Sequence, residues 1–400
     1  MAFVQGEFER LCAIARADSI GNKDRSIENE DREMNRTESV AIVGAGNGGC
    51  AAAVDLTLRG FEVRLYGRSP ATLAPLQARG GIEYEGIFGE GLVRIGVITN
   101  DAAEATRGVD VIVAMAPAQA HEDIAALLAP HITREQVLFA APGHTLTLIP
   151  NTIRRHGRAE ALTCATSTLP YICRKTAEGR VRVSRAAAKL RFAAFPASRT
   201  EELAGRLSPL FPAIVPVPTI LDTLFPYTNA IHHPPALLCN LGRLESTGGD
   251  YYHYYDGITP SVGALIDRLD QERQTIAAAF GCHVDRISEH FFQMGYTDAN
   301  GRAGGTAYST FHNSEPNRWI KAPSSIDHRF FNEDIPFGLV PFSELARVAN
   351  VASPVTDAVV LLASAITGKP YREAGLNVAK MGFNGLNAAQ VRRLVEQGYA

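Results

Sequence analysis

The 400-residue chain lacks several features that would place it in a specialised class of protein. It contains no run of about 18 apolar residues, so we expect no transmembrane helix. Lysine and arginine total 39 and aspartate and glutamate 42, and this near balance favours neither nucleic acid nor an anionic membrane as a partner. The six cysteines form no Cys-x-x-Cys pair, so we expect reduced core thiols and no metal site.

The first 38 residues differ in composition from the rest of the chain. The apolar residues near the start are interrupted by charges at Glu7, Glu9 and Arg10, whereas a secretory signal needs an unbroken apolar core. The stretch GNKDRSIENEDREMNRTE that follows is almost wholly polar. We therefore expect residues 1–38 to form a disordered extension and the protein to be cytoplasmic.

Residues 39–67 predict one β-α-β unit. The apolar run SVAIV is followed by GAGNGG, then by a stretch with helical spacing, and then by the alternating run FEVRLYG. Continuous apolar runs at 109–117 and 136–143, separated by helix-like segments, are typical of parallel strands that are buried on both faces. This pattern predicts an α/β fold with a Rossmann-type, doubly wound parallel sheet.

The second half of the chain has a different pattern. Beyond about residue 205 most segments are helix-like, several open on a Ser, Thr, Asn or Pro start signal, and strand signals are few. We predict a dinucleotide-binding domain over 39–205 and a mainly α-helical substrate domain over 206–400. Within the latter, the Gly-, Ser- and Asn-rich segment 295–317 predicts a long loop.

The glycine-rich turn GAGNGG has the context that a dinucleotide site requires, because it follows a strand and opens a helix. Gly44 makes the tight turn, Gly46 lets the backbone approach the pyrophosphate, and Gly49 lets the helix pack closely on the sheet. Asn47 and Gly48 lie at the start of that helix, whose N-terminus attracts anions. We predict that these five residues bind the cofactor.

The end of the second strand indicates which cofactor is used. NAD sites usually place Asp or Glu there to bind the ribose 2′-hydroxyl, but this chain reads LYGRSP and has no acid. Arg68 is suited to a 2′-phosphate, so we predict that NADP(H) is preferred. The alternative is that Arg68 is a solvated surface residue and that NAD(H) is used.

Several segments of the second half together resemble one family. The stretch NAIHHPPALLCNLGRLES, at 229–246, resembles the signature that opens the helical domain of the opine dehydrogenases, the family of octopine and nopaline dehydrogenases. The segments at 254–281 and 322–341, and LPYICR at 169–174, are similar to other family stretches in the same order. The resemblance runs from about residue 39 to the C-terminus.

The resemblance implies a reductive condensation of two small-molecule substrates. In this family an amino acid and a 2-oxo acid form an imine, which NAD(P)H reduces to an opine. By motif, His233 and Asp334 match the family's acid–base pair. Arg329 matches the arginine that holds the cofactor or a substrate anion. Histidine suits this work because its pKa lies near neutral pH.

Neighbouring residues leave alternatives open. His232 is expected to be a capping or surface ring, and Glu333 is a rival to Asp334. Because Pro234 follows His233, we expect this histidine just before the first turn of a helix.

Substrate contacts are expected from side chains that can bind carboxylate or amine groups. The predicted residues are Asn229, His144 and Arg174. A homodimer is a further possibility that the sequence leaves open.

Two other functions compete with this interpretation. A Rossmann-plus-helical keto-acid reductase, like ketopantoate reductase, would need a catalytic lysine, and the second half has only Lys321, Lys369 and Lys380, none in a comparable motif. A non-catalytic NADP(H)-binding sensor would keep the glycine-rich turn but need no His–Asp pair.

Overall fold

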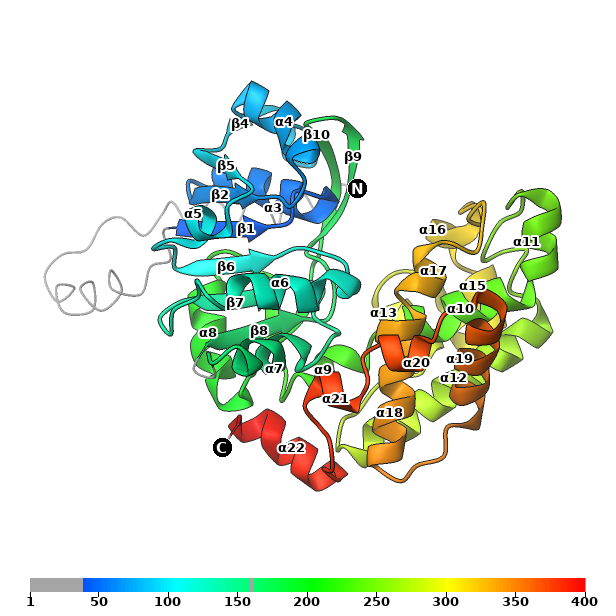
Figure 1. Cartoon of the computed structure of the whole chain (residues 1–400). Helices are drawn as coiled ribbons and strands as arrows, with labels where there is room; N and C mark the ends of the chain where they lie inside the picture. The colour runs from blue at the N-terminus through cyan, green and yellow to red at the C-terminus, as the bar shows by residue number, and fades with distance from the viewer. Residues whose placement is uncertain (1–38, 159–160, 400) are drawn as a thin grey trace, which may run out of the picture. The chain divides into compact units, whose positions relative to one another are not determined.

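The computed structural model describes residues 39–158 and 161–399. The predicted disordered extension, 1–38, lies outside these described residues. Along the described chain, an α/β part is followed by a part made of helices (Figure 1). None of the helices in the described ranges is long and apolar enough to cross a bilayer.

An eight-stranded sheet forms the centre of the α/β part, in the order β12-β11-β8-β7-β6-β1-β2-β5. Its strands are β1 (Ser39–Val43), β2 (Glu62–Tyr66), β5 (Val97–Thr99), β6 (Val111–Ala114), β7 (Val137–Ala140), β8 (Leu162–Thr166), β11 (Leu190–Phe195) and β12 (Ile214–Pro216). Neighbouring strands are parallel, apart from β11 against β8. The strand order changes direction between β1 and β6, and such switch points are where open α/β sheets bind ligands.

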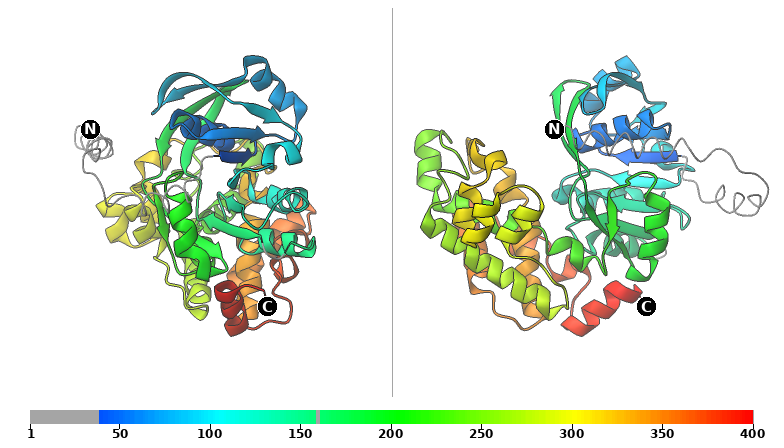
Figure 2. Two further views of the ribbon diagram at one scale, coloured as in Figure 1. Left: turned by 90° about the vertical axis from the view of Figure 1, so that its left-hand side faces the viewer. Right: turned by 180° about the vertical axis from the view of Figure 1, so that it is seen from behind.

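Helices cover both faces of this sheet, which confirms the predicted doubly wound α/β fold. In β1, Val40 and Ile42 face one core, while Ala41 and Val43 face the other, as the period of two requires. The first face carries α3 (Asn47–Leu58) and α8 (Thr200–Leu207), which is the green helix beside the sheet in the right-hand view of Figure 2. The second face carries α5 (Ala102–Thr106), α6 (His121–Leu128) and α7 (Leu148–Arg155).

A second sheet, which we did not predict, packs on the outer side of α3. It has the order β4-β3-β10-β9 and consists of β3 (Gly81–Gly86), β4 (Gly89–Arg94), β9 (Tyr171–Ala177) and β10 (Arg180–Ala186). The short helix α4 (Pro70–Arg79) precedes it. The hydroxyl of Tyr171 donates to Asp55 of α3 at 2.6 Å and so ties β9 to the helix that follows the glycine-rich turn.

The main sheet extends past the domain boundary that the sequence predicts. β12 pairs with β11 at Ile214–Pro216, beyond residue 205. A three-residue edge strand bounded by prolines carries too little alternation to be recognised from its sequence. The C-terminal helix α22 (Ala388–Gln397) also packs against β11. We propose a boundary after Pro216, with α22 returning to the first domain.

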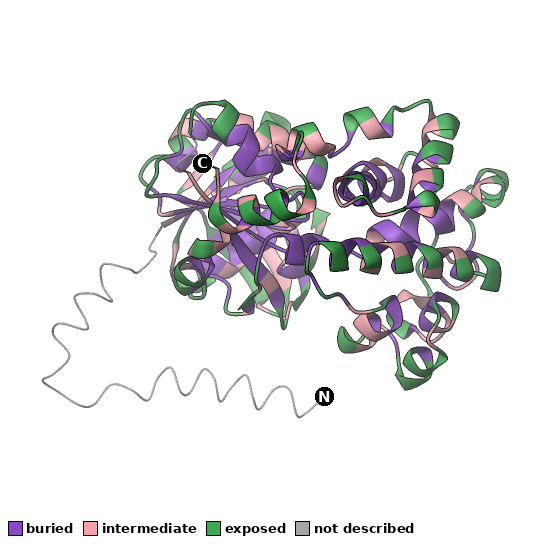
Figure 3. Ribbon diagram, turned by 90° about the horizontal axis from the view of Figure 1, so that it is seen from below, coloured by how far each residue is buried: buried purple, intermediate pink, exposed green. Residues whose placement is uncertain are grey.

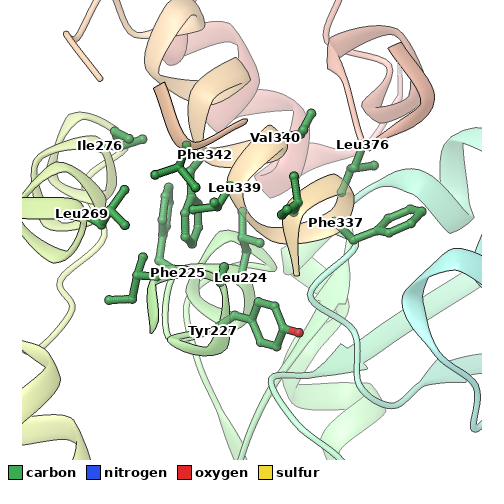
Figure 4. Packing of buried hydrophobic residues seen from close by; sticks show 14 of the residues in the cluster. Leu224, Phe225, Tyr227, Leu269, Ile276, Phe337, Leu339, Val340, Phe342 and Leu376 are labelled. Carbon is green, nitrogen blue, oxygen red and sulfur yellow. The ribbon is translucent and has the colours of Figure 1, made fainter. Parts of the chain in front are cut away.

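Helices make up the second part, as predicted. They are α9 (Leu221–Leu224), α10 (Asn229–Cys239), α11 (Leu241–Thr247), α12 (Pro260–Ala279), α13 (Ile287–Gln293), α14 (Ala299–Gly304), α15 (Ala307–His312), α16 (Glu315–Arg318), α17 (Arg329–Asn332), the π-helical turn η3 (Ile335–Leu339), α18 (Val340–Val348), α19 (Pro354–Thr367), α20 (Tyr371–Ala374) and α21 (Val378–Met381). Their buried sides face one another and their exposed sides face solvent (Figure 3). Figure 4 shows the centre of this core, where Phe225, Leu269 and Phe342 pack together.

Two local predictions were wrong. Residues 295–317 form three short helices rather than a long loop, because side chains begin them: Asp298 accepts from the N–H of Gly301, and Thr306 forms a capping box with Ser309. α10 begins at Asn229, so His233 and the prolines after it lie inside the helix rather than at its first turn. Burial of this segment in the helical core overrides the helix-breaking preference of proline.

Candidate active site

The glycine-rich turn between β1 and α3 has the geometry that a pyrophosphate needs. Gly44 has φ of +123°, and a Cβ on it would lie 2.5 Å from the carbonyl oxygen of Met115. A Cβ on Gly49 would lie 1.6 Å from the carbonyl oxygen of Gly44, so only glycine fits there. Nothing lies within 4 Å of the corresponding position on Gly46, and no side chain caps the N-terminus of α3. The turn therefore fits a dinucleotide phosphate, with open space at Gly46 and unpaired helix amides behind it.

Asn47 bonds to β9, the strand of the second sheet that carries Arg174. The side-chain oxygen of Asn47 accepts a hydrogen bond from the backbone N–H of Lys175 at 2.8 Å, so this side chain holds β9 against the turn. A Cβ on Gly48 would lie 3.3 Å from the side chain of Leu169, just before β9. Arg174 is exposed on β9. Among the described residues, no hydrogen bond or ion pair joins Arg174 to His233 or Asp334, and its substrate role stays a prediction.

Arg68 lies directly after β2, where a dinucleotide's adenosine ribose is expected. Its side chain is 86% exposed, and its nearest acidic partner is Asp123 of α6, at 4.0 Å. Ser69 caps α4 by accepting from the N–H of Thr72. The guanidinium and the start of α4 together offer positive charge at this position.

His233 and Asp334, the predicted acid–base pair, are in direct contact. Nδ1 of His233 lies 2.7 Å from Oδ2 of Asp334, and the side chains are 7% and 0% exposed. The imidazole stacks on Phe330, with ring centroids 3.8 Å apart. The pair joins the middle of α10 to the residue that precedes η3.

Each end of this pair bonds to the hydroxyl of a tyrosine. The hydroxyl of Tyr227 donates to Oδ1 of Asp334, and the hydroxyl of Tyr254 lies 2.7 Å from Nε2 of His233. We predicted neither contact. Tyr254 belongs to the YYDGITP stretch that carries the family resemblance, whereas nothing in the sequence around Tyr227 singles it out.

Burial sets the charge state of the pair. Desolvation raises the pKa of Asp334 to about 6, while the hydrogen bond from Tyr227 and the nearby Arg329 guanidinium oppose that rise. Desolvation, together with the charge of Arg329, lowers the pKa of His233 well below its ordinary value. Near neutral pH the pair therefore carries one negative charge, with His233 neutral and its proton on Nδ1.

Glu333, the rival carboxylate, faces another partner. Its Oε1 accepts from the backbone N–H of Ala118 at 3.2 Å, and its Oε2 lies 3.0 Å from Arg329. Ala118 follows β6, so this contact brings the segment that carries Asp334 to the carboxyl end of the main sheet. Arg329 is 52% exposed beside the buried pair and can reach an anion there.

His144 lies beside the His233–Asp334 pair as well, and it comes from the end of a second strand of the main sheet. It follows β7, is fully buried, and stacks on Tyr227 with ring centroids 3.8 Å apart and an angle of 7° between planes. Neither of its ring nitrogens has a hydrogen-bond partner among the described residues. The neighbouring His121 is different, because it bonds Thr145 and the carbonyl of Ala116 and so has a structural role.

The remaining two candidates lie on α10. Asn229 is half-buried at the first position of the helix. His232 is buried and faces the interior of the helical core, where it contacts Phe291 and Phe311. The expectation of a surface or capping ring at His232 is therefore wrong, because neighbouring helix positions point in different directions and this one points into the core.

Known protein families match both halves of the chain. Residues 39–143 match the family described as NAD-dependent glycerol-3-phosphate dehydrogenase N-terminus. Residues 216–367 match the family described as NAD/NADP octopine/nopaline dehydrogenase, alpha-helical domain.

Individual proteins are similar over most of the chain. Opine dehydrogenase of Arthrobacter sp. (strain 1C) is 34% identical over 365 residues, which cover 91% of this chain and 100% of that relative. An octopine dehydrogenase structure with NADH and L-arginine has a TM-score of 0.76 at 20% identity, covering 91% of this chain and 99% of that one. A yersinopine dehydrogenase with NADP⁺ has a TM-score of 0.68 at 14% identity, with coverage of 91% and 99%.

The two structural likenesses, at 20% and 14% identity, concern the fold alone. The sequence identity goes further, because it extends over the whole length of the Arthrobacter enzyme. The resemblance stated from the motifs is thereby confirmed. This chain belongs to the opine dehydrogenase family and is an NAD(P)-dependent oxidoreductase that acts on CH–NH donors.

Proposed function

We propose that this opine dehydrogenase joins the amine of an amino acid to a 2-oxo acid at the His233–Asp334 pair, with NADPH as its preferred reductant. The position of the pair is the observation that supports this most. Ala118 after β6 bonds Glu333, next to Asp334, and His144 after β7 stacks on the tyrosine that bonds Asp334. The carboxyl ends of such strands are where Rossmann folds bind the reacting end of their cofactor.

His233 moves the protons of the condensation. Its unprotonated Nε2 takes a proton from the attacking amine as the C–N bond forms and passes it to the former carbonyl oxygen, which gives the neutral carbinolamine. Nε2 then takes the second N–H proton and delivers it to the hydroxyl, so that the C–O bond breaks, water departs and the imine remains. Asp334 holds Nδ1–H and stabilises the transient positive charge on the ring. NAD(P)H, when bound, supplies the hydride that reduces the imine carbon.

Arg329, Asn229 and His144 are the residues that we propose hold the substrates. Arg329 combines a half-exposed guanidinium with a place beside the buried pair, which suits a carboxylate of the oxo acid or of the amino acid. His144 offers ring nitrogens that bond to none of the described residues. Asn229 opens the helix that carries His233. Arg174 remains a candidate for a part of the substrate that reaches β9.

The preference for NADPH rests on Arg68 and on the five residues of the glycine-rich turn. Gly44, Gly46, Gly49 and the first-turn amides of Asn47 and Gly48 would hold the pyrophosphate. Arg68 is exposed and only distantly paired, so it is available to a 2′-phosphate. No acid stands at the end of β2 to select the 2′-hydroxyl of NADH.

The lysines of the helical part do not support a keto-acid reductase. Lys321 pairs with Asp250, Lys369 with Asp327 and Lys380 with Glu122, all in surface ion pairs. A catalytic lysine would have to face the reacting centre. The His–Asp pair, in turn, is a feature that a cofactor sensor would not need.

A panel assay tests the proposed function. Purified protein is given NADPH or NADH with single 2-oxo acids, each with and without single amino acids, and loss of nicotinamide absorbance is followed. We expect oxidation only when both substrates are present, and faster oxidation of NADPH. Oxidation with an oxo acid alone would instead identify a keto-acid reductase, and NADPH binding without turnover on any pair would favour the sensor.

We further propose that the enzyme works in the cytoplasm. The described cysteines are free thiols, which a reducing compartment preserves. Fractionation of cells that express the chain tests this location. The homodimer considered from the sequence remains a prediction, which light scattering of the purified protein tests.

A further inference from the structure

The His233–Asp334 pair is enclosed by two tyrosine hydroxyls, one at each end. Tyr227 lies in the turn before α10, and its ring is held against His144. Tyr254 lies in the turn before α12, and its ring stacks on Phe311 with centroids 5.3 Å apart. Both rings are buried, so packing aims both hydroxyls at the pair. The hydrogen-bonded chain runs Tyr227, Asp334, His233, Tyr254.

The direction of each hydrogen bond follows from the charge on the pair. An ionised carboxylate only accepts, so Asp334 accepts both from Nδ1–H of His233 and from the Tyr227 hydroxyl. With its proton on Nδ1, His233 has a lone pair on Nε2. The Tyr254 hydroxyl must then donate to Nε2. When the pair carries one negative charge, this arrangement of protons is the one that satisfies all three hydrogen bonds.

We propose that Tyr227 and Tyr254 are positioning residues that hold the pair as ionised Asp334 and neutral, Nδ1-protonated His233. The inference rests on the proposed function and names what keeps Nε2 unprotonated, the state from which it acts as the base. When Nε2 takes a proton in the reaction, the Tyr254 hydroxyl can no longer donate to it and turns to accept from Nε2–H or releases it. Tyr254 thus opposes premature protonation of His233, and Tyr227 opposes protonation of Asp334.

Other charged or titratable groups face the pair and enter its titration. They come from the elements packed around it and are Arg329, His328, Glu333, His232 and His253. Arg329 favours ionised Asp334 and disfavours protonated His233. Its effect has the same sign as that of the two tyrosines, so the test must change the tyrosines alone.

Tyr227→Phe and Tyr254→Phe each remove one hydroxyl and leave the ring in place. Both hydrogen bonds stabilise the deprotonated pair, so losing either makes the pair bind a proton more readily. We expect the acidic limb of the kcat/KM profile to move to higher pH by about 1 unit in each variant, the size of one lost hydrogen bond. Tyr251→Phe is the matched control, because that buried hydroxyl has no hydrogen-bond partner in the part of the chain that the structure describes. The pH profile of this variant should not move.

A purely structural role predicts a different result. It would lower stability in Tyr227→Phe and Tyr254→Phe but leave the acidic limb where it is in wild type and in Tyr251→Phe. That outcome would overturn the proposal, as would a shift to lower pH. Because the two observable pKa values of such a pair belong to both residues, the shift is assigned to the pair as a whole.

Nitrogen NMR of ¹⁵N-histidine-labelled wild-type enzyme tests the proposed protonation state without turnover, and a variant is needed only to assign the signal. The signal of His233 is assigned by its loss in His233→Gln. At pH 7 and without substrate we expect a neutral ring protonated on Nδ1; an imidazolium or an Nε2-protonated ring there contradicts the proposal. This readout stands even if the panel assay finds no opine synthesis. Conversely, the protein could make opines while the pH profiles of Tyr227→Phe and Tyr254→Phe match that of wild type. In that case only the proposed role of the tyrosines would be wrong.

Discussion

Nδ1 of His233 and Oδ2 of Asp334 lie 2.7 Å apart although 101 positions separate the two residues in the chain. The neighbouring carboxylate, Glu333, bonds Ala118 and Arg329 instead. The pair is buried from water and sits where contacts from two strand ends of the main sheet converge.

Replacement of His233 by Ala should remove the proton-transferring group. We expect turnover to fall by about 10²- to 10⁴-fold, the usual range for loss of general acid–base catalysis. The affinity for NADPH, measured by fluorescence titration, should stay within about twofold, since the glycine-rich turn is untouched. His283→Ala, at a site that is 94% exposed, is the control. A decrease of less than tenfold in His233→Ala would speak against the assigned role.

Asp334→Asn and Glu333→Gln separate the two adjacent carboxylates. An asparagine at 334 can no longer hold Nδ1–H with a full negative charge, so we expect kcat to fall by about 10²-fold or more. Glu333→Gln keeps an oxygen that can accept from Ala118, and we expect a loss below about tenfold. Steady-state kinetics of both variants at one pH show which of the two carboxylates the reaction needs. The reverse order of effects would make Glu333 the functional carboxylate.

Arg68→Ala should change the choice of cofactor. Loss of a charge-assisted contact to the 2′-phosphate should raise KM for NADPH by about 10- to 100-fold, whereas KM for NADH should hardly change. Arg68→Lys, which keeps the charge but not the fork of donors, should fall between wild type and Arg68→Ala. Equal effects on the two cofactors would mean that Arg68 is only a solvated surface residue.

His144→Phe should reduce the sensitivity of the fold to acid. Burial lowers the pKa of His144 to about 3, from the ordinary value of 6.5. A lowered pKa contributes stability that is fully present above pH 6.5 and is lost as the pH falls towards 3, because only the unfolded chain takes up the proton. A phenylalanine takes up no proton in the unfolded chain, so it removes this dependence of stability on pH. It also preserves the stack on Tyr227.

Urea unfolding between pH 6.5 and 4 measures this effect. The unfolding free energy of His144→Phe should fall less steeply than that of wild type, by up to about 1.4 kcal/mol per pH unit. His283→Phe, at an exposed site, serves as the comparison. If His144 also contacts substrate, the same variant should show a raised KM for one of the two substrates at pH 7. Parallel stability curves for the variant and wild type would contradict the acid-sensitivity prediction.

Arg273 of α12 should matter for stability rather than for the reaction. It is 1% exposed, pairs with Asp270 at 2.6 Å, and donates to the carbonyl of Phe225. Arg273→Met would leave the buried Asp270 carboxylate without its cation, and we expect a loss of about 3–5 kcal/mol in unfolding free energy. Arg268→Met on the exposed side of the same helix should cost less than about 0.5 kcal/mol. Denaturant unfolding of both variants measures the difference.

Local sequence patterns determined the first β-α-β unit, the helical second half, the fold class and the cofactor turn. Buried parallel strands need continuous apolar runs, and the turn after β1 needs glycine at Gly44 and Gly49, so these features follow from a few neighbouring residues. The motif at 229–246 likewise indicated the family and singled out His233 as the candidate acid–base residue. The same local reasoning failed at β12 and at α10, where edge pairing and burial override short-range preference.

Contacts between distant segments were decided only by the tertiary structure. The second sheet pairs β3 with β10, and no local pattern records which strands will meet. The same holds for the contact of His233 with Asp334 instead of Glu333, for the inward direction of His232, and for the contacts of Tyr227 and Tyr254. A hydrogen bond between segments depends on how helices and strands pack, which is a property of the whole core and not of the residues on either side of the bond.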